Sequence, residues 1–322
     1  MVGCMQLPPT GDDRPVVLAL RALKLGDLLV AVPALHAIKR ARPDHRLVYA
    51  APGWLRPIVS LVDSVDDLLP TPGLDDPLDL EPGSVETVVN LHGNGPESRG
   101  ALERLRAPVR LGHHAPGWDG PEWLDGIHER DRWARLVSAH GMPADPLDMR
   151  LRVPAVRPVV PNATVVHVGA FYGSRQWPVT RFAEVARALT EDGQRVVFTG
   201  SAAEAARARE VAALSGLPDE TVLAGRLELD GFASLIAAAA LVVSADTGAA
   251  HLASAYRVPS VVLFGPAPVE EWGPPADGPH IVLTDATLRR GDTFGSEPDP
   301  AILAVTPADV VSAARSLASR PV

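Results

Sequence analysis

Residues 241–266 (LVVSADTGAAHLASAYRVPSVVLFGP) concentrate polar groups at the end of an apolar segment. Asp246, Thr247 and Gly248 follow that segment, and a helix of small residues carrying His251 precedes a second apolar segment. This pattern is typical of a β-α-β unit. Ligands of open α/β sheets bind outside the carboxyl ends of the strands, and the free N–H groups of a helix N-terminus favour an anion there. The stretch therefore predicts a small-molecule ligand that bears phosphate.

Three further polar junctions follow predicted strands, at residues 24–27 (KLGD), 169–178 (GAFYGSRQWP) and 200–204 (GSAAE). No GxGxxG follows the first apolar segment, so dinucleotide binding of the Rossmann type is not predicted. The chain contains no P-loop motif and no GxSxG nucleophile elbow.

Segments of strand and helix length alternate through both halves of the chain, which predicts doubly wound parallel sheets. In the first half, strands are expected at 16–22, 46–50, 65–69 and 85–91, helices at 28–40, 54–62 and 129–140, and a long loop at 112–131. In the second half, strands are expected at 164–168, 194–199 and 261–264 and from residue 241, with helices at 180–191, 202–215, 231–240 and 307–319. Thr180, Asp246 and Thr306 are the expected N-caps of the helices that they precede.

A proline-rich run at 150–162 (RLRVPAVRPVVPN) predicts an interdomain linker. We therefore expect two α/β domains of similar size with a cleft between them, residues 1–155 and 156–322. The last helix either completes the second domain or packs back on the first.

Composition excludes several classes of protein. The 322 residues carry a net charge of −9, which argues against nucleic acid as a partner. Cys4 is the one cysteine, so no intrachain disulfide forms, and no His/Cys cluster has metal-ligand spacing. No run of 18 apolar residues predicts a membrane-spanning helix, and residues 1–15 look like a short tail rather than a signal peptide. We expect a cytoplasmic protein with at most peripheral membrane contact.

Four blocks of the chain, taken in order, resemble glycosyltransferase family 9, the ADP-heptose heptosyltransferase family. They are RALKLGDLLVAVPALHAIKRARP, VVHVGAFYGSRQWPVTRFAEVARAL, VVFTGSAAEAARAREVA and SADTGAAHLASAYRVPSVVLFGPAPVEEWGPP. The region 70–148 shows little of the family's pattern, and in this family that half receives the acceptor.

The resemblance implies the GT-B fold, in which two α/β Rossmann-like domains have parallel sheets facing across a cleft. The first domain would bind the acceptor and carry the catalytic base, and the second would bind the nucleotide-sugar donor. The reaction implied is inverting transfer of a heptose from ADP-heptose to a hydroxyl of a glycan, a lipid-linked or a small-molecule acceptor. No metal and no cofactor besides this co-substrate is expected, so helix N-termini, hydroxyls and basic side chains must stabilise the leaving diphosphate.

Asp27 matches the family's general base, because an inverting transfer needs one carboxylate to take the proton of the attacking hydroxyl. The alternative from spacing alone is that Asp27 only caps the helix that follows it. His92 and Asn94 are candidate acceptor contacts. His113 and His114 belong either to a mobile acceptor loop or to a solvated surface.

The resemblance also implies the donor site. Arg175 stands where the family has lysine and would contact the diphosphate, although a loop arginine alone is more simply a surface residue. Thr247 and Gly248 would present hydroxyl and N–H groups to the phosphates, while Asp246 and His251 also lie at the donor site. Gly200, Ser201 and Glu204 would hold the nucleoside, with the alternative that Glu204 only complements a helix dipole. Trp177 is expected to be a packing residue.

Two other functions use the same scaffold. A hydrolysing nucleotide-sugar epimerase would turn the donor over without an acceptor, but it would need more acid and base groups in the second half than Asp246, Glu204 and His251 supply. A non-catalytic member of the family would bind a nucleotide or a partner only, and the presence of Asp27 together with the donor residues argues against it.

Overall fold

The computed structural model describes residues 13–319, and the chain divides into two compact units between Arg152 and Val153. This division falls within the proline-rich run at 150–162. Cys4 and most of the expected N-terminal tail lie outside the described residues. Among residues 13–319, no helix is both long and apolar enough to traverse a membrane.

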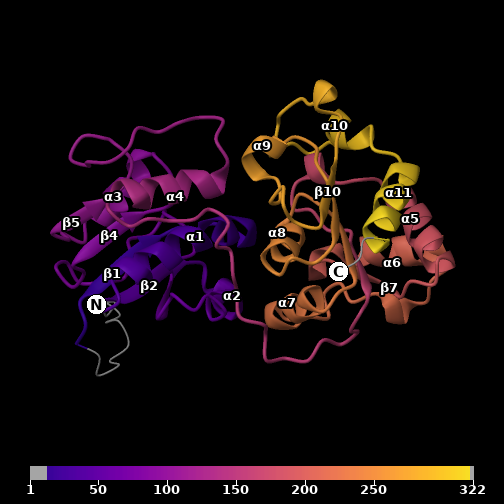
Figure 1. Ribbon diagram of the computed structural model, residues 1–322, viewed down its shortest axis with the longest axis horizontal. Coiled ribbons are helices and arrows are strands. Elements are labelled where there is room, and N and C mark those ends of the chain that lie inside the picture. The colour runs from indigo at the N-terminus through magenta and orange to yellow at the C-terminus, as the bar shows by residue number, and fades with distance from the viewer. Residues whose placement is uncertain (1–12, 320–322) are drawn as a thin grey trace. The chain divides into compact units, whose positions relative to one another are not determined.

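Five parallel strands form the sheet of the first domain in the order β3-β2-β1-β4-β5 (Figure 1). They are β1 (Val16–Leu20), β2 (Arg46–Ala51), β3 (Asp67–Pro70), β4 (Thr87–Asn90) and β5 (Val109–Leu111). The helices are α1 (Leu25–Ala41), α2 (Arg56–Val59), α3 (Pro96–Glu103) and α4 (Glu129–Ala139), with a 3-10 turn η1 (Gly53–Leu55) before α2. Helices α1 and α4 lie side by side.

Helix α1 brings its N-terminus to the carboxyl end of β1, because only four residues separate β1 from α1. Most of its residues are apolar and buried, among them Leu28, Leu35 and Ile38. A helix that is apolar on nearly all sides must be buried on nearly all sides, so α1 is held firmly by its packing. Its first turn is therefore a well-fixed platform at the edge of the sheet where ligands bind.

The second domain repeats this plan with a parallel sheet in the order β10-β9-β8-β6-β7. Its strands are β6 (Thr164–His167), β7 (Val196–Thr199), β8 (Leu241–Ala245), β9 (Ser260–Leu263) and β10 (His280–Leu283). Its helices are α5 (Val179–Glu191), α6 (Ala205–Ser215), α7 (Leu229–Ala237), α8 (Gly248–Ala255), α9 (Val269–Trp272), α10 (Pro300–Leu303) and α11 (Pro307–Ala318). Short 3-10 turns add η2 (Gly173–Arg175), η3 (Ala202–Glu204), η4 (Asp219–Thr221) and η5 (Ala286–Leu288).

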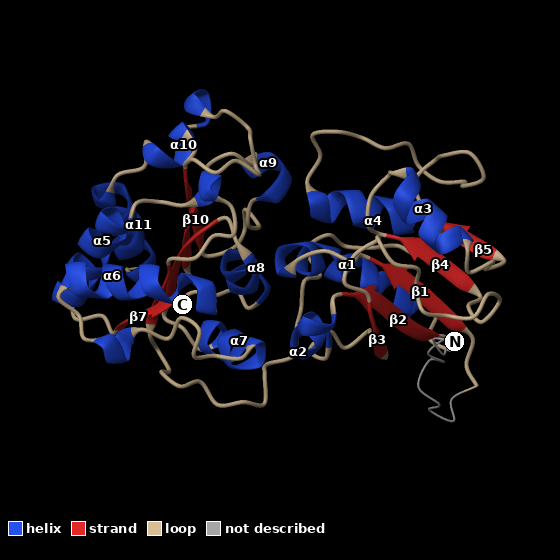
Figure 2. Ribbon diagram, turned by 180° about the vertical axis from the view of Figure 1, so that it is seen from behind, coloured by secondary structure: helices blue, strands red, loops and turns tan. Residues whose placement is uncertain are grey.

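Helices cover both faces of this second sheet (Figure 2). Val261 and Leu263 of β9 join the core that includes α5, α6 and α11, while Val262 packs in a separate cluster with Ala250 of α8. Alternate residues of a strand point to opposite faces, so a strand that is buried on both faces must be apolar throughout. The near-continuous apolar runs of the sequence arise from this constraint.

Several expected elements are confirmed and several were missed. The strands of the two sheet centres and the five longest helices lie close to where the sequence predicts them. The prediction did not include the short elements α3, β5, α9, β10 and α10. Helix α11 packs on α5, β9 and β10, so it completes the second domain. Trp177 is fully buried and donates its indole N–H to the carbonyl of Val305 at 3.1 Å, as expected of a packing residue.

The predicted N-caps have different outcomes. Thr306 is an N-cap, because its hydroxyl accepts the N–H of Asp309 at 3.3 Å while the Asp309 carboxylate accepts the N–H of Thr306 at 2.9 Å. The prediction for Thr180 was wrong. Helix α5 starts at Val179 and its N-cap is Pro178, whose carbonyl accepts the N–H of Arg181 and of Phe182.

Replacing Thr306 by Ala should lower the free energy of unfolding by about 1 kcal/mol, the usual cost of losing an N-cap hydroxyl. Thr180→Ala is the matched control, because Thr180 is also exposed near the start of a helix but caps nothing. Its effect should stay within about 0.5 kcal/mol. Urea denaturation of both variants measures the difference, and equal losses would contradict the assignment of the caps.

Candidate active site

Each sheet has one point at which the order of strands reverses. In the second domain the chain goes from β6 outward to β7 and then returns to β8 on the other side of β6. In the first domain the same reversal separates β1 from β4. The connections that leave neighbouring strands at such a point diverge to opposite faces, and the crevice between them binds ligands. Each domain therefore has its own candidate site residues, which follow β1 and β4 in the first domain and β6 and β8 in the second.

The residues after β8 prepare the N-terminus of α8. Thr247 is the N-cap, and its hydroxyl accepts the N–H of Ala249 at 3.3 Å and lies 2.9 Å from the Ser244 hydroxyl. The expectation that Asp246 caps this helix was wrong, because the Asp246 carboxylate points to other partners. Gly248 is the first residue of α8, so its N–H is one of the unbonded donors at that end.

Asp246 is almost completely buried and pairs with Arg175 from the turn η2. One guanidinium N–H group of Arg175, that of Nη1, donates to Asp246 Oδ2 at 2.9 Å and to the Asp246 carbonyl at 3.1 Å. Nε2 of His251 lies 3.6 Å from Asp246 Oδ1. The structure thus brings together four predicted residues, Arg175, Asp246, Thr247 and His251, from two loops that are far apart in the sequence.

Glu204 is the last residue of the turn η3, which follows β7. Its carboxylate accepts the N–H of Ser201 at 2.7 Å. The backbone of Gly169 passes so close that a Cβ built there would meet the Glu204 carboxylate at 2.3 Å. At Gly200, a Cβ would lie 3.1 Å from the Glu204 Cβ. Both glycines therefore make room for this side chain.

Arg207 was not among the predicted site residues, and it holds the loop of residues 169–176 in place. Its guanidinium donates to the carbonyl of Val168 at 2.9 Å and to that of Trp177. Partial burial lowers the pKa of Arg207, while Glu204 and Glu210 act in the opposite sense. Arg207 thus joins the two ends of residues 169–176 to helix α6. Its position in the first turn of an alanine-rich helix gave no sign of this role.

In the first domain Asp27 lies in the first turn of α1, where its side chain is 22% exposed. Its Oδ2 accepts the N–H of Lys24 at 3.2 Å, and its Oδ1 accepts from Arg21 at 2.9 Å. Helix α1 begins at Leu25, three residues earlier than predicted, so Asp27 is the third helical residue and not the N-cap. The carboxylate therefore supports the helix end and also remains accessible to solvent.

Arg21 holds Asp27 and was missed in the sequence analysis. Its side chain is 2% exposed. It donates to the carbonyls of Asp27 and Leu91 at 2.7 and 2.6 Å, and to Glu129 Oε2 at 3.2 Å, while its guanidinium lies 4.6 Å from the ring centroid of Trp133. Arg21 thus ties the residues after β1 and β4 to helix α4. Glu129 follows Arg21 by 108 residues, and no local pattern reveals such a contact.

His92 reaches the same place from β4, because its Nδ1 accepts the N–H of Ala22 at 3.2 Å. Burial and the Arg21 charge lower the pKa of His92. Asn94 lies further along the loop, where its carbonyl and side-chain oxygen accept from Arg99.

His113 is buried and therefore not solvated. It is 2% exposed, with its ring 4.8 Å from that of Trp123 and 5.9 Å from that of Trp133. Burial, then the nearby cations Arg132 and Arg135, lower the pKa of His113 to about 4. His114 is exposed.

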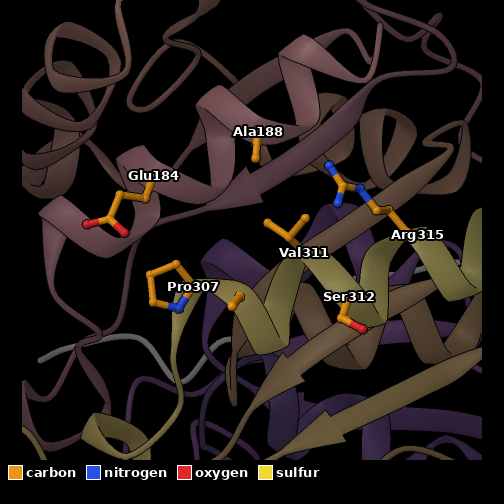
Figure 3. Close-up of a pocket in the computed structure, with 7 residues that line it drawn as sticks. Glu184, Ala188, Pro307, Val311, Ser312 and Arg315 are labelled. Atoms are coloured by element: carbon orange, nitrogen blue, oxygen red, sulfur yellow. The ribbon is translucent and has the colours of Figure 1, made fainter.

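A hollow of about 480 Å³ lies elsewhere, between α5 and α11 (Figure 3). It is lined by residues of the two helices, including Ala188, Val311 and Arg315. None of its lining residues follows the carboxyl end of a strand, so we do not assign it to a substrate. Among residues 13–319, no group of three or more His, Cys, Asp or Glu side chains is placed to hold a metal ion.

Known proteins resemble both halves of the chain. The sequence model of Glycosyltransferase family 9 (heptosyltransferase) matches residues 148–293. Lipopolysaccharide heptosyltransferase 2 of Salmonella typhimurium is 25% identical over an alignment that covers 92% of this chain and 96% of the relative. Lipopolysaccharide heptosyltransferase 1 of Pseudomonas aeruginosa is 41% identical, over 34% of this chain and 30% of the relative.

Solved structures share the fold. The ADP-heptose lipopolysaccharide heptosyltransferase II of Escherichia coli superposes with a TM-score of 0.75 at 22% identity, covering 94% of this chain and 98% of that one. An E. coli heptosyltransferase solved with ADP gives a TM-score of 0.72 at 19% identity, covering 94% and 99%. The two domains are thus the Rossmann-like domains of the GT-B fold. The protein is a glycosyltransferase, and its residues 148–293 match the model of glycosyltransferase family 9.

Proposed function

We propose that the protein transfers a heptose from ADP-heptose, with inversion, to a hydroxyl group of a glycan, glycolipid or natural-product acceptor. The relatives named above as ADP-heptose or lipopolysaccharide heptosyltransferases support the choice of donor. We infer that the first domain carries the base and the second the donor site. The protein is proposed to work in the cytoplasm, without a metal ion.

One observation carries this division of roles. Each domain holds an arginine–aspartate pair at its strand reversal, with an N···O distance of 2.9 Å in both. In the first pair the arginine is buried, at 2% exposure, and the Asp27 carboxylate is the open partner at 22%. In the second pair Asp246 is buried, at 4%, and the Arg175 guanidinium is open at 26%. An open carboxylate suits a base, whereas an open guanidinium beside a helix N-terminus suits a diphosphate.

The chemistry follows from these groups. As the acceptor oxygen attacks the anomeric carbon, Asp27 takes its proton, and the bond from that carbon to the diphosphate oxygen breaks. Arg175, the Thr247 hydroxyl and the N–H of Gly248 stabilise the negative charge that the leaving diphosphate gains. Asp246 holds Arg175 in position through one carboxylate oxygen, and His251 lies next to the other oxygen. The Glu204 carboxylate accepts hydrogen bonds from the ribose hydroxyls of the donor.

The test of the base is Asp27→Asn, which keeps the size of the side chain but cannot accept the proton. With an acceptor that the wild-type enzyme uses, turnover of ADP-heptose should fall roughly 10²- to 10⁴-fold, the range for losing a general base. The affinity for ADP should not change, because Asp27 lies in the other domain. Asp67→Asn is the control, since Asp67 pairs with Arg46 at 2.6 Å at the opposite end of the strands. Near-normal turnover of Asp27→Asn would contradict the assignment of Asp27 as the general base.

The test of the donor site is Arg175→Ala. It should weaken ADP binding roughly 10- to 100-fold, as expected for a charge-assisted hydrogen bond of about 1.5–3 kcal/mol. Arg175→Lys should lose less affinity for ADP, because the positive charge stays and only the planar set of guanidinium N–H donors is lost. Titration calorimetry measures both, with Arg187→Ala as the control, since Arg187 is exposed and bonds to the Leu214 carbonyl. Unchanged affinity in folded Arg175→Ala protein would place the diphosphate elsewhere.

The competing epimerase would turn over ADP-heptose without an acceptor. A comparison of ADP release with and without acceptor separates the two activities. Release that does not depend on the acceptor would favour the hydrolysing enzyme.

A further inference from the structure

His167 lies at the strand reversal of the second domain but has no part in the roles described so far. It is the last residue of β6, and its backbone stands in register with Thr199 of β7 and Ser244 of β8. It therefore lies at the carboxyl edge of the sheet, between the loop of Glu204 and the loop of Asp246. A residue at this position lies at the edge of the sheet where ligands of such folds bind.

The contacts of His167 leave one ring nitrogen available. Nδ1 lies 3.0 Å from the Thr199 hydroxyl, and the ring is 5.5 Å from that of Phe232 in α7. Among the hydrogen bonds of residues 13–319, the His167 ring makes this one through Nδ1 and none through Nε2. Burial lowers the pKa of His167 to about 4, and the neighbouring Glu204 carboxylate acts in the opposite sense. The ring is therefore neutral near pH 7, with one donor and one acceptor nitrogen.

The groups around His167 suit a nucleoside rather than a phosphate. The Glu204 carboxylate can accept from the two hydroxyls of a ribose, a neutral imidazole can bond to a hydroxyl or to the edge of a base, and Phe232 offers an aromatic ring. The cationic Arg175 and the helix N-terminus, which suit phosphate, belong to the neighbouring loop after β8 and to η2. The groups that suit a nucleoside thus lie on strands and loops adjacent to those that suit phosphate, as a nucleoside diphosphate requires.

We propose that His167, supported by Phe232, is a specificity-determining residue that binds the nucleoside of the donor through Nε2. The inference rests on the proposed function, because it takes ADP as the ligand. It adds two residues, His167 and Phe232, to the predicted nucleoside contact at Glu204.

The chain offers a matched control for this proposal. His280 starts β10, and its Nδ1 lies 2.9 Å from the hydroxyl of Ser260, its register partner at the start of β9. His280 and His167 thus make the same contact, an imidazole on a hydroxyl of the adjacent strand. They lie at opposite ends of the parallel strands, and only His167 lies at the carboxyl end, where a ligand binds.

Calorimetric titration of folded protein with ADP and, separately, with inorganic pyrophosphate tests the proposal. His167→Ala should weaken ADP binding roughly three- to tenfold, the loss expected for one neutral hydrogen bond. Phe232→Leu should weaken it by a similar factor, as expected for losing an aromatic contact. Neither variant should change the affinity for pyrophosphate, which lacks the nucleoside. His280→Ala should leave both affinities at the wild-type value.

Three results would overturn the proposal. ADP affinity could be unchanged in both His167→Ala and Phe232→Leu. Alternatively, ADP and pyrophosphate affinity could fall together, which would indicate a distorted loop rather than a lost nucleoside contact. Wild-type protein that binds pyrophosphate but not ADP would contradict the proposed donor as well, so that this failure is recognisable by itself.

Discussion

The arrangement of both domains depends on a pairing of one arginine with one aspartate at the point where the strand order reverses. Arg21 and Asp27 form this pair in the first domain, and Arg175 and Asp246 in the second. An arginine that is buried needs a partner for its charge, and a buried aspartate needs one equally. The Arg175–Asp246 pair joins the segments that follow β6 and β8, and Arg21 joins the segments that follow β1 and β4 through its bond to the Leu91 carbonyl. Each pair leaves one charged group open at the edge where substrates bind.

Which member of the pair is buried decides what the open member can do. Arg21 is surrounded by Glu129, the Trp133 ring and two backbone carbonyls, so its charge is satisfied within the fold. Asp246 has Arg175 on one oxygen and His251 near the other. One domain thus offers solvent a carboxylate and the other a guanidinium. A transfer reaction with an anionic leaving group requires both.

Much of this could be predicted from the sequence, because strand ends in parallel sheets meet at one edge. The apolar runs ending at Asp246, Gly200 and Gly169 identified that edge, and the resemblance supplied Asp27 and Arg175. Apart from α3, the elements that escaped prediction have three or four residues, which carry little periodic signal. The contact of Arg21 with Glu129 could not be predicted, because it depends on helix α4 packing beside α1. The N-cap of α8 was assigned one residue too early because the Asp246 carboxylate is held by Arg175 instead.

A crystal structure of the protein with ADP would show most directly whether the open Arg175 and the N-terminus of α8 form the anion site. We expect diphosphate oxygens within hydrogen-bond distance of the Arg175 guanidinium and the N–H of Gly248, with the ribose at Glu204. ADP bound elsewhere, such as in the hollow between α5 and α11, with Arg175 still paired only to Asp246, would contradict it.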